Sequence, residues 1–438
     1  MVMLSSFPRF CLCFCLFLTA IGVLTPTASA RQRNYVVGAS VNLAGGVNNL
    51  PPSNIPGLSS KTLASFYSAH PGILVSSAGA NSNLNLSYNF GLNARNARNS
   101  SNSNSHALSV SYTSRLASSW RLNIRESLMI TDDESTFNAI QGIPSGNLLQ
   151  AVAQAGSVQS QSQGNAVPGI SGTGSGGSNY LFYPVTTNTS TTTNNVSVVM
   201  EYILSAESTL SFNGNHNLRR YEDPSRFAGI LSNQERYSGG MNYQRRISIR
   251  EAWNVSYSGS FDKFANFSNS NANSQSVTVG YSNMLTPSLT FFAAAGASDV
   301  RSRGANGRYT GYDASLSLQK TLLSNSFAFR FSQNSGTQSG LGSTSNLRSI
   351  GANVSRNFKR MTAFVDAAMF DSSGSLGNQF SATGANATSN IGVIITKTFS
   401  IHGGIHYQRY GQSIFAFASK RAFVSLRYRS PDLFRVSR

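Results

Sequence analysis

Residues 84–93 read Leu84-Asn85-Leu86-Ser87-Tyr88-Asn89-Phe90-Gly91-Leu92-Asn93, an unbroken alternation of apolar side chains with polar residues or glycine. Because a β-strand turns successive side chains to opposite faces, this segment would have one apolar face and one polar face. The same two-residue period returns through most of the chain. Strands of this kind are typical of a barrel with lipid outside and water inside. The sequence therefore predicts an all-β protein, a transmembrane up-and-down antiparallel β-barrel.

The pattern yields about 16 candidate strands, and 14 to 18 is the range that it allows. Most of these strands are near the roughly 9–11 residues that a tilted membrane strand requires. They lie at 84–94, 107–113, 120–130, 196–204, 209–219, 236–246, 252–261, 276–284, 289–298, 309–320, 327–333, 347–358, 361–370, 386–397, 401–409 and 415–428.

The connections between these strands alternate in length. The short ones are 114–119, 205–208, 247–251, 285–288, 321–326, 359–360 and 398–400. Those between them are longer and mostly rich in Asn, Gly and Ser, except the short connection 410–414. Short periplasmic turns and long external loops would produce this arrangement, whereas a soluble β-sandwich, the alternative, has no reason to sort its loops by length. Aromatic residues also gather near the short-turn ends, where an interfacial girdle is expected: Tyr112, Trp120, Tyr202, Tyr243, Trp253 and Phe358.

Residues 1–30 have the features of a cleaved secretory signal peptide. Arg9 is their only charged residue, residues 11–24 are apolar, and Ala28-Ser29-Ala30 is a small-x-small cleavage site. The apolar run is shorter than the roughly 18–20 residues of a spanning helix, which argues against a membrane anchor. The three cysteines of the chain all lie in this segment, so the exported protein would have no disulfide and no thiolate metal site.

Two regions fall outside the regular pattern. Residues 31–83 contain several prolines and only a short alternating run from Tyr35 to Leu43. We expect them to form a periplasmic tail or a plug in the lumen, with further strands as the alternative. The barrel would then occupy residues 84–438. Its loop 131–195 is much longer than the others, and its low complexity predicts mobility, although the aromatic patch around Tyr183 could instead anchor it.

Charge and composition exclude several other classes of protein. The chain has 34 basic and 16 acidic residues, a net charge of +18, yet only 11% of its residues are charged. The basic residues are scattered and an export signal precedes them, so nucleic acid is not an expected partner. A disordered secreted chain could share this composition, but disorder does not explain the two-residue period. A basic lumen, or a basic rim facing lipopolysaccharide, accounts for the charge better.

The alternation also predicts which charged residues face the lumen. The candidate cations are Arg95, Arg121, Arg125, Arg219, Arg236, Arg246, Arg330, Arg421 and Arg427, and the candidate anions are Glu201, Asp313 and Asp366. For Arg95, Arg219, Arg236 and Arg246, pairing at the strand ends with acids or lipid phosphate is at least as good an explanation. We therefore predict a pore lining of Arg121, Arg125, Arg330, Glu201, Asp313 and Asp366, because inward arginines favour the passage of anions.

No pattern of catalytic, cofactor-binding or metal-binding residues stands out. His402 and His406 share a face, but four residues along a strand separate them by roughly 13 Å, too far for one metal ion. The acids Asp132-Asp133-Glu134 open the longest loop and are more simply read as solvated. There is no phosphate-binding glycine loop and no nucleophile elbow. We expect no enzymatic activity and no cofactor.

In strand count and loop pattern, residues 84–428 resemble the general porins and related channel-forming outer-membrane proteins of Gram-negative bacteria. The resemblance implies contact with outer-membrane lipid and lipopolysaccharide, insertion by the barrel assembly machinery, and the homotrimers of many sixteen-stranded porins. It implies a passive channel for small polar or anionic solutes. An export barrel for an acidic polysaccharide, and a non-transporting surface barrel that binds partners through its loops, are the alternatives.

Overall fold

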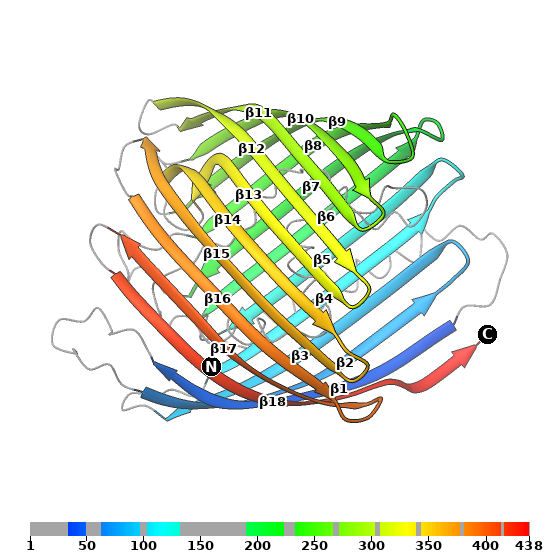
Figure 1. The fold of residues 1–438 in the computed structure, drawn as a ribbon, viewed down its shortest axis with the longest axis vertical. Coiled ribbons are helices and arrows are strands. Elements are labelled where there is room, and N and C mark those ends of the chain that lie inside the picture. The colour runs from blue at the N-terminus through cyan, green and yellow to red at the C-terminus, as the bar shows by residue number, and fades with distance from the viewer. Residues whose placement is uncertain are drawn as a thin grey trace.

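The chain folds into one β-barrel wall (Figure 1). The computed structural model describes residues 34–49, 63–96, 103–131, 190–222, 233–265, 271–302, 307–338, 343–376, 381–412 and 416–437. The strands in this part of the chain are β1 (Asn34–Asn49), β2 (Leu63–Ala78), β3 (Ser82–Asn96), β4 (Ser103–Arg115), β5 (Trp120–Thr131), β6 (Thr191–Ile203), β7 (Ser208–Tyr221), β8 (Gln234–Arg246), β9 (Glu251–Phe264), β10 (Ala272–Thr286), β11 (Leu289–Ser302), β12 (Gly307–Leu322), β13 (Asn325–Gln338), β14 (Ser343–Asn357), β15 (Met361–Leu376), β16 (Ser381–Ile394), β17 (Phe399–Gln412) and β18 (Ala416–Ser437). Among the described residues, no helix is long and apolar enough to span a membrane.

The 18-stranded sheet is closed. Every strand pairs antiparallel with its neighbours in sequence, and β1 pairs with β18 from Asn34↔Ser437 to Asn49↔Lys420. Closure gives every strand a paired neighbour on both sides, which is how a sheet satisfies its backbone hydrogen bonds inside a membrane. The predicted fold class, an all-β antiparallel barrel, is therefore confirmed, with a strand count at the upper limit of the expected range.

The two additional strands come from the segment before residue 84. All sixteen predicted strands form, as β3 to β18, but the prediction of a tail or plug over 31–83 is wrong, because residues 34–49 and 63–78 form β1 and β2. The alternation is hidden in β2, where the inward positions include Phe66 and Leu74 and the outward ones include Ser65 and Pro71. A period count therefore misses this strand, although it completes the wall.

The last strand is longer than predicted. The pairing of β18 with β17 ends at Tyr428, but β18 continues beside β1 as far as Ser437. Pro431 lies in this extension, where its missing N–H costs little because one side of the strand has no partner there. A register shift between Val37 and Ala39 of β1 lies opposite the same residues, as a β-bulge would.

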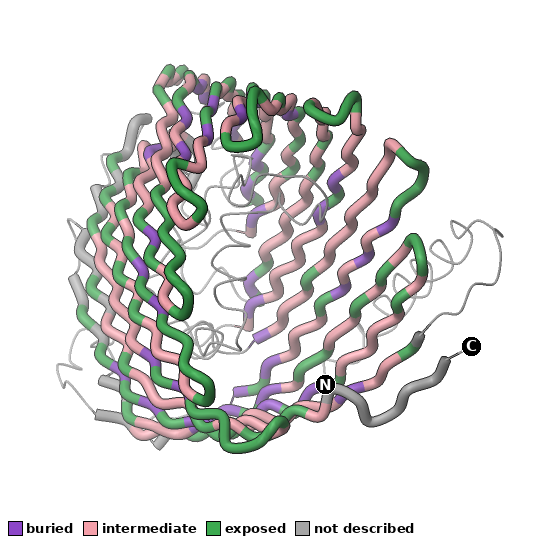
Figure 2. Tube along the Cα trace, turned by 45° about the vertical axis from the view of Figure 1, so that its right-hand side comes forward, coloured by how far each residue is buried: buried purple, intermediate pink, exposed green. Residues whose placement is uncertain are grey.

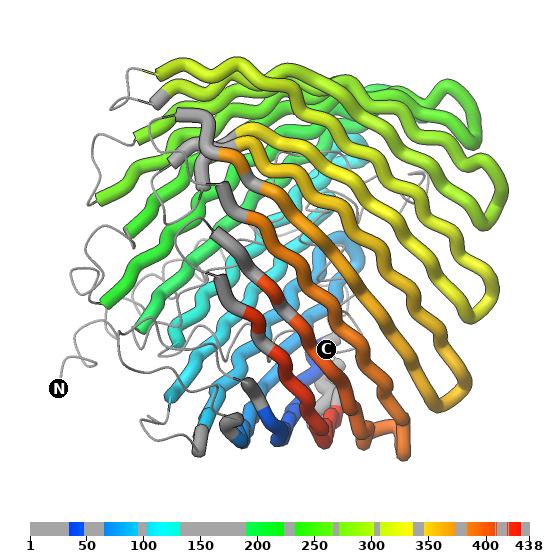
Figure 3. The backbone as a smooth tube through the Cα atoms, turned by 60° about the vertical axis from the view of Figure 1, so that its left-hand side comes forward, coloured from blue at the N-terminus to red at the C-terminus, as the bar shows by residue number. Residues whose placement is uncertain are grey.

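The connections form two sets at opposite ends of the barrel, and all the longest ones are at one end (Figure 3). The short turns are 79–81, 116–119, 204–207, 247–250, 287–288, 323–324, 358–360 and 395–398. The connections at the other end, the long-loop end, range from 413–415 to 132–190, and those at 303–306, 339–342, 377–380 and 413–415 are no longer than the short turns, because the strands extend further than predicted. The start of β1 and the end of β18 are on the short-turn side. Most of loop 131–195, with the acids 132–134 and the aromatic patch near Tyr183, lies outside the described residues, as does the predicted signal peptide 1–30.

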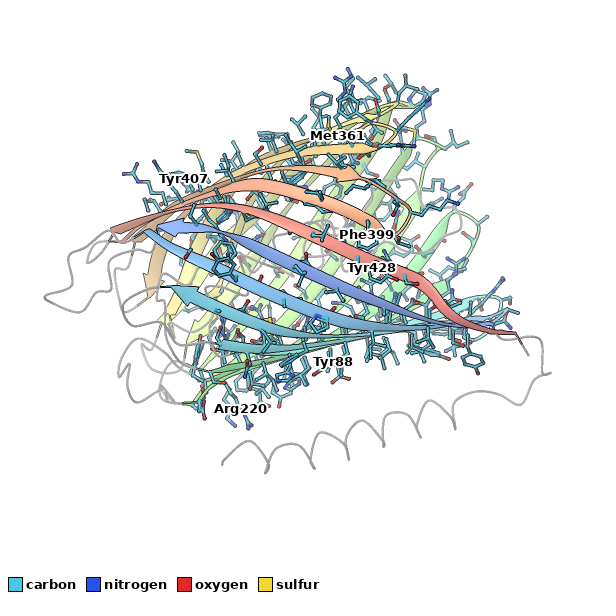
Figure 4. The ribbon with its side chains drawn as sticks, turned by 90° about the horizontal axis from the view of Figure 1, so that it is seen from below. Tyr88, Arg220, Met361, Phe399, Tyr407 and Tyr428 are labelled. Atoms are coloured by element: carbon cyan, nitrogen blue, oxygen red, sulfur yellow. The ribbon has the colours of Figure 1, made fainter. Side chains whose placement is uncertain are left out.

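The strand register separates the wall into an apolar outer face and a polar inner face. Large exposed hydrophobic residues such as Ile73, Met369, Ile405 and Val424 share the outward set, as do the six side chains labelled in Figure 4. The short turns themselves are also largely exposed, as the green segments in Figure 2 show.

The predicted aromatic girdle lies on the outer face near the short turns. Trp120 packs on Tyr202 with ring centroids 4.5 Å apart, and Tyr243 meets Trp253 edge to face at 5.4 Å. Amphipathic rings of this kind concentrate at membrane interfaces. They mark the depth at which the apolar band of the wall begins.

Candidate pore lining

On the inner face, side chains from neighbouring strands lie opposite one another and form rows around the wall. One such row runs through Ser111, Arg125, Ser197, Asn215 and Ser238 on β4 to β8. Small polar side chains dominate these rows. On β9 and β10 they form a ladder of hydroxyl pairs, Ser256–Thr278, Ser258–Ser276 and Ser260–Ser274, with oxygen separations of 2.6, 2.8 and 2.6 Å.

All six predicted pore-lining residues occupy inward register positions, but they lie in separate sectors of the wall. Arg121, Arg125 and Glu201 are on β5 and β6, Asp313 is on β12, and Arg330 and Asp366 are on β13 and β15. The side chain of Asp313 accepts a hydrogen bond from the backbone N–H of Ser335 at 3.0 Å, which gives it a structural role in the wall.

Several of the arginines lie beside acids. Arg121 is directly opposite Glu201 on the neighbouring strand, and Arg330 is a charged neighbour of Asp366. Arg236 lies 3.8 Å from the buried carboxylate of Asp262 and donates a hydrogen bond to Ser260 at 3.3 Å. These neighbouring acids weaken the field that the arginines project into the lumen.

Arg125 is different. Its neighbours across β4 and β6 are the uncharged residues Ser111 and Ser197. Within the described part of the chain, its guanidinium forms no ion pair. Of the three predicted pore arginines, it is therefore the one whose charge is least compensated.

A second cationic sector lies where the barrel closes. We call it the seam sector and define it as the inward residues His70, His402, His406, Arg421 and Arg427 of β2, β17 and β18. The strands β17, β1 and β2 contain no acid, and the only acid of β18 is Asp432, in the extension beyond Tyr428. The two arginines are six residues apart on one strand, so the sector extends roughly 20 Å along the wall.

The base of the seam sector is packed rather than loose. Phe66, Phe423 and Ala44 form a buried apolar cluster on three adjacent strands, and the guanidinium carbon of Arg421 lies 3.8 Å from the centroid of the Phe66 ring. This geometry is that of a cation–π contact. The phenyl ring of Phe423 covers Gly404, where an added Cβ would come within 2.8 Å of it.

The histidines of the sector are held by hydroxyl groups or buried in the wall. His406 Nδ1 is 2.9 Å from the Thr388 hydroxyl, and His402 Nε2 is 2.9 Å from the Ser400 hydroxyl. His70 is only 9% exposed, and its Nε2 has no hydrogen-bond partner within the described residues. Arg427 lies opposite Ser400 and Asn42, both uncharged.

From sequence, His402 and His406 were considered only as a metal-ligand pair, and His70 was assigned no role. Within the described ranges no group of three metal-binding side chains occurs. Sequence reasoning also missed Asp262 as an inward acid, because the predicted strand ended at residue 261. The alternation Ser256, Ser258, Ser260, Asp262 continues for one more position and contains the signal.

The closed strand order, the apolar outer band and the polar inner wall define an outer-membrane β-barrel of the porin type. No protein-family model and no curated protein sequence matches the chain. Solved structures of similar architecture include OccK2 (OpdF) of Pseudomonas aeruginosa in complex with glucuronate, at 10% identity and a TM-score of 0.48, covering 91% of this chain and 98% of that one. OpdK of Pseudomonas aeruginosa with vanillate is 12% identical with a TM-score of 0.46, covering 90% and 99%. The siderophore receptor PirA of Pseudomonas aeruginosa is 8% identical with a TM-score of 0.43, covering 90% and 80%. Each is a likeness of barrel architecture.

Proposed function

We propose that the protein is a passive outer-membrane channel for small polar solutes, with a preference for anions. The observation that carries this proposal is the seam sector, where the half-buried Arg427 and the buried Arg421, 4% exposed, lie with three histidines on one strip of the inner wall. The only acid of its strands lies at the far end of β18. A cationic strip on a low-dielectric wall raises the local concentration of anions. The serine ladder opposite it supplies donors and acceptors for the hydroxyl groups of polar solutes.

The strands formed by residues 34–49 and 63–78 support a channel over a surface-binding barrel. The surface-barrel alternative depended on residues 31–83 filling the lumen, but most of that segment forms two strands of the wall. We further propose that residues 1–30 are removed on export, and that lipopolysaccharide contacts the outer face at the long-loop end.

The test is electrical. The protein, extracted from outer membranes and inserted into a planar bilayer, should show stable single-channel conductance. Under a salt gradient, its reversal potential should have the sign of anion selectivity. The double variant Arg421→Gln/Arg427→Gln should move that potential toward zero, whereas Gln244→Ala, which removes an uncharged inward side chain from β8, should leave it unchanged. A folded barrel without conductance would refute the channel, and cation selectivity would refute the anion preference.

A further inference from the structure

The outer wall is not uniformly suited to lipid. On β11 to β18, the outward residues at mid-height are uncharged and mostly apolar, for example Leu316, Phe329, Val365 and Ile405, with Ser389 as a polar exception. Charged residues appear only toward the strand ends. On β5 to β9 the band is interrupted. Glu126 points outward from the middle of β5, between Val110 and Val196 on the neighbouring strands.

The depth of Glu126 follows from the girdle. It is six residues from Trp120, which on a strand tilted by about 45° corresponds to roughly 14 Å along the membrane normal. This distance reaches near the middle of an apolar band about 25 Å tall. A carboxylate there is poorly matched to acyl chains, and its sole hydrogen bond within the described residues is a long one from the Asn194 amide at 3.5 Å.

The polar interruption continues across the neighbouring strands. His216 lies in the same register row as Glu126, one strand beyond Val196. Its ring stacks on Tyr237 at 4.7 Å, and its Nε2 is 3.3 Å from the carboxylate of Glu235. The Tyr237 hydroxyl donates to the same carboxylate at 2.5 Å.

Beside this network lies a groove in the outer wall. Gly214, Gly239 and Gly259 occupy one register row on β7, β8 and β9 and form its floor. Tyr237 and Phe261 stand along one side and Tyr257 along the other, and the groove holds about 710 Å³. Without Cβ atoms on the floor, another surface can approach the backbone closely.

Charges of both signs surround the groove. Glu126 is an acid with one weak partner, whereas Arg220 and Lys263 are outward cations on β7 and β9 nearer the long loops, Lys263 lying opposite Glu235 of β8. Two copies inserted in the same direction face each other at equal depth, so Glu126 of one copy would lie level with the row of His216 and Tyr237 of the other, and the groove could receive exposed rings such as Tyr257. The patch is in this sense self-complementary. This is the property that an interface between identical subunits requires. Acyl chains offer no partner for the carboxylate.

We propose that the outer face of β5 to β9, centred on Glu126 and the glycine-floored groove, is the surface through which two copies of this chain associate side by side in the membrane. The apolar sector β11 to β18 faces lipid. Association would give Glu126 a polar neighbour and fill the groove with side chains of the second copy. The proposal is independent of what passes through the lumen.

The test measures the molecular mass of the protein in detergent and the proximity of two copies in the membrane. Scattering-derived mass in mild detergent should give more than one copy for the parent protein. The Glu126→Leu variant should be shifted toward the monomer while its barrel keeps or gains thermal stability, because the apolar band of the outer wall then continues across β5. Glu126→Gln, which changes the side chain least, should show a smaller shift in the same direction.

Proximity is measured in intact outer membranes with a thiol cross-linker. Met241→Cys, beside the groove, and Met369→Cys, on β15, form a matched pair of outward substitutions. A cross-linked dimer from Met241→Cys, with none from Met369→Cys or the parent chain, supports the proposal. A monomeric parent protein, equal cross-linking at both sites, or an unchanged mass in Glu126→Leu would overturn it. So would a monomer whose groove retains a co-purified lipid that Gly239→Leu displaces.

Discussion

Arg125 provides the sharpest test of how the inner wall selects ions. Its neighbours are Ser111 and Ser197, so Arg125→Gln removes one positive charge that no adjacent acid offsets. An ion passing about 7 Å from the guanidinium in water interacts with it by about 0.6 kcal/mol. Screening at 0.1 M salt, with a Debye length of about 10 Å, reduces this value by about half. The sign is opposite for anions and cations, so the permeability ratio should fall roughly threefold.

The assay is the reversal potential of single channels under a salt gradient. Arg125→Lys, which keeps the charge, should retain the parent ratio. The double variant Arg121→Gln/Glu201→Gln removes a neighbouring pair with no net charge and should change the ratio much less than Arg125→Gln does. In 1 M salt, where the Debye length is about 3 Å, the effect of Arg125→Gln should nearly vanish. An unchanged ratio in Arg125→Gln at low salt, or a larger change in the double variant, would show that ions do not pass near this residue.

Three further predictions concern the stability of the wall, measured by urea unfolding followed by tryptophan fluorescence. Phe423→Ala should lower the free energy of unfolding by about 3 kcal/mol, because the ring is 5% exposed and packs in the seam; a loss below that of Phe423→Leu would contradict this packing. Gly46→Val should prevent barrel closure, because an added Cβ meets the Ala422 carbonyl and lies 2.9 Å from the Phe66 ring. This failure is read instead in gels, as loss of the heat-modifiable folded band. Asp262→Asn should cost about 1–3 kcal/mol, because the fully buried carboxylate accepts from Gln234 at 2.9 Å and faces Arg236; full stability would show that a neutral side chain satisfies these groups equally well.

The two-residue period is enough to predict the strands and the face on which a residue lies. Whether a residue holds an odd or an even position in its strand, its parity, determines whether its side chain points inward or outward. The inward positions of Arg125, Arg330 and Asp366 follow from parity alone. Parity does not determine which residues are neighbours, because that depends on the register between strands. The position of Glu201 opposite Arg121, and the absence of an acid opposite Arg125, therefore could not be predicted.

The seam sector was beyond sequence reasoning for a related reason. Arg421 of β18 and Phe66 of β2 come into contact only because β1 pairs with β18, and no local sequence pattern predicts that pairing. In β2 the inward Phe66 and outward Pro71 also disguise the alternation. The polar interruption at Glu126 was visible as a charge on the apolar side of its strand, but its depth required the position of the girdle.

The pairing of β1 with β18 has a consequence for the life of the chain before it reaches the membrane. The partner of residues 34–49 is β18, which is synthesised nearly 400 residues later, so β1 must wait until the chain has been made as far as that strand. Until then, both ends of the sheet present unsatisfied N–H and C=O groups and are open to pairing with other chains. A copy truncated anywhere before residue 416 would keep those two edges permanently. Loss of the final strand should therefore lead to aggregation or degradation rather than to a smaller working barrel.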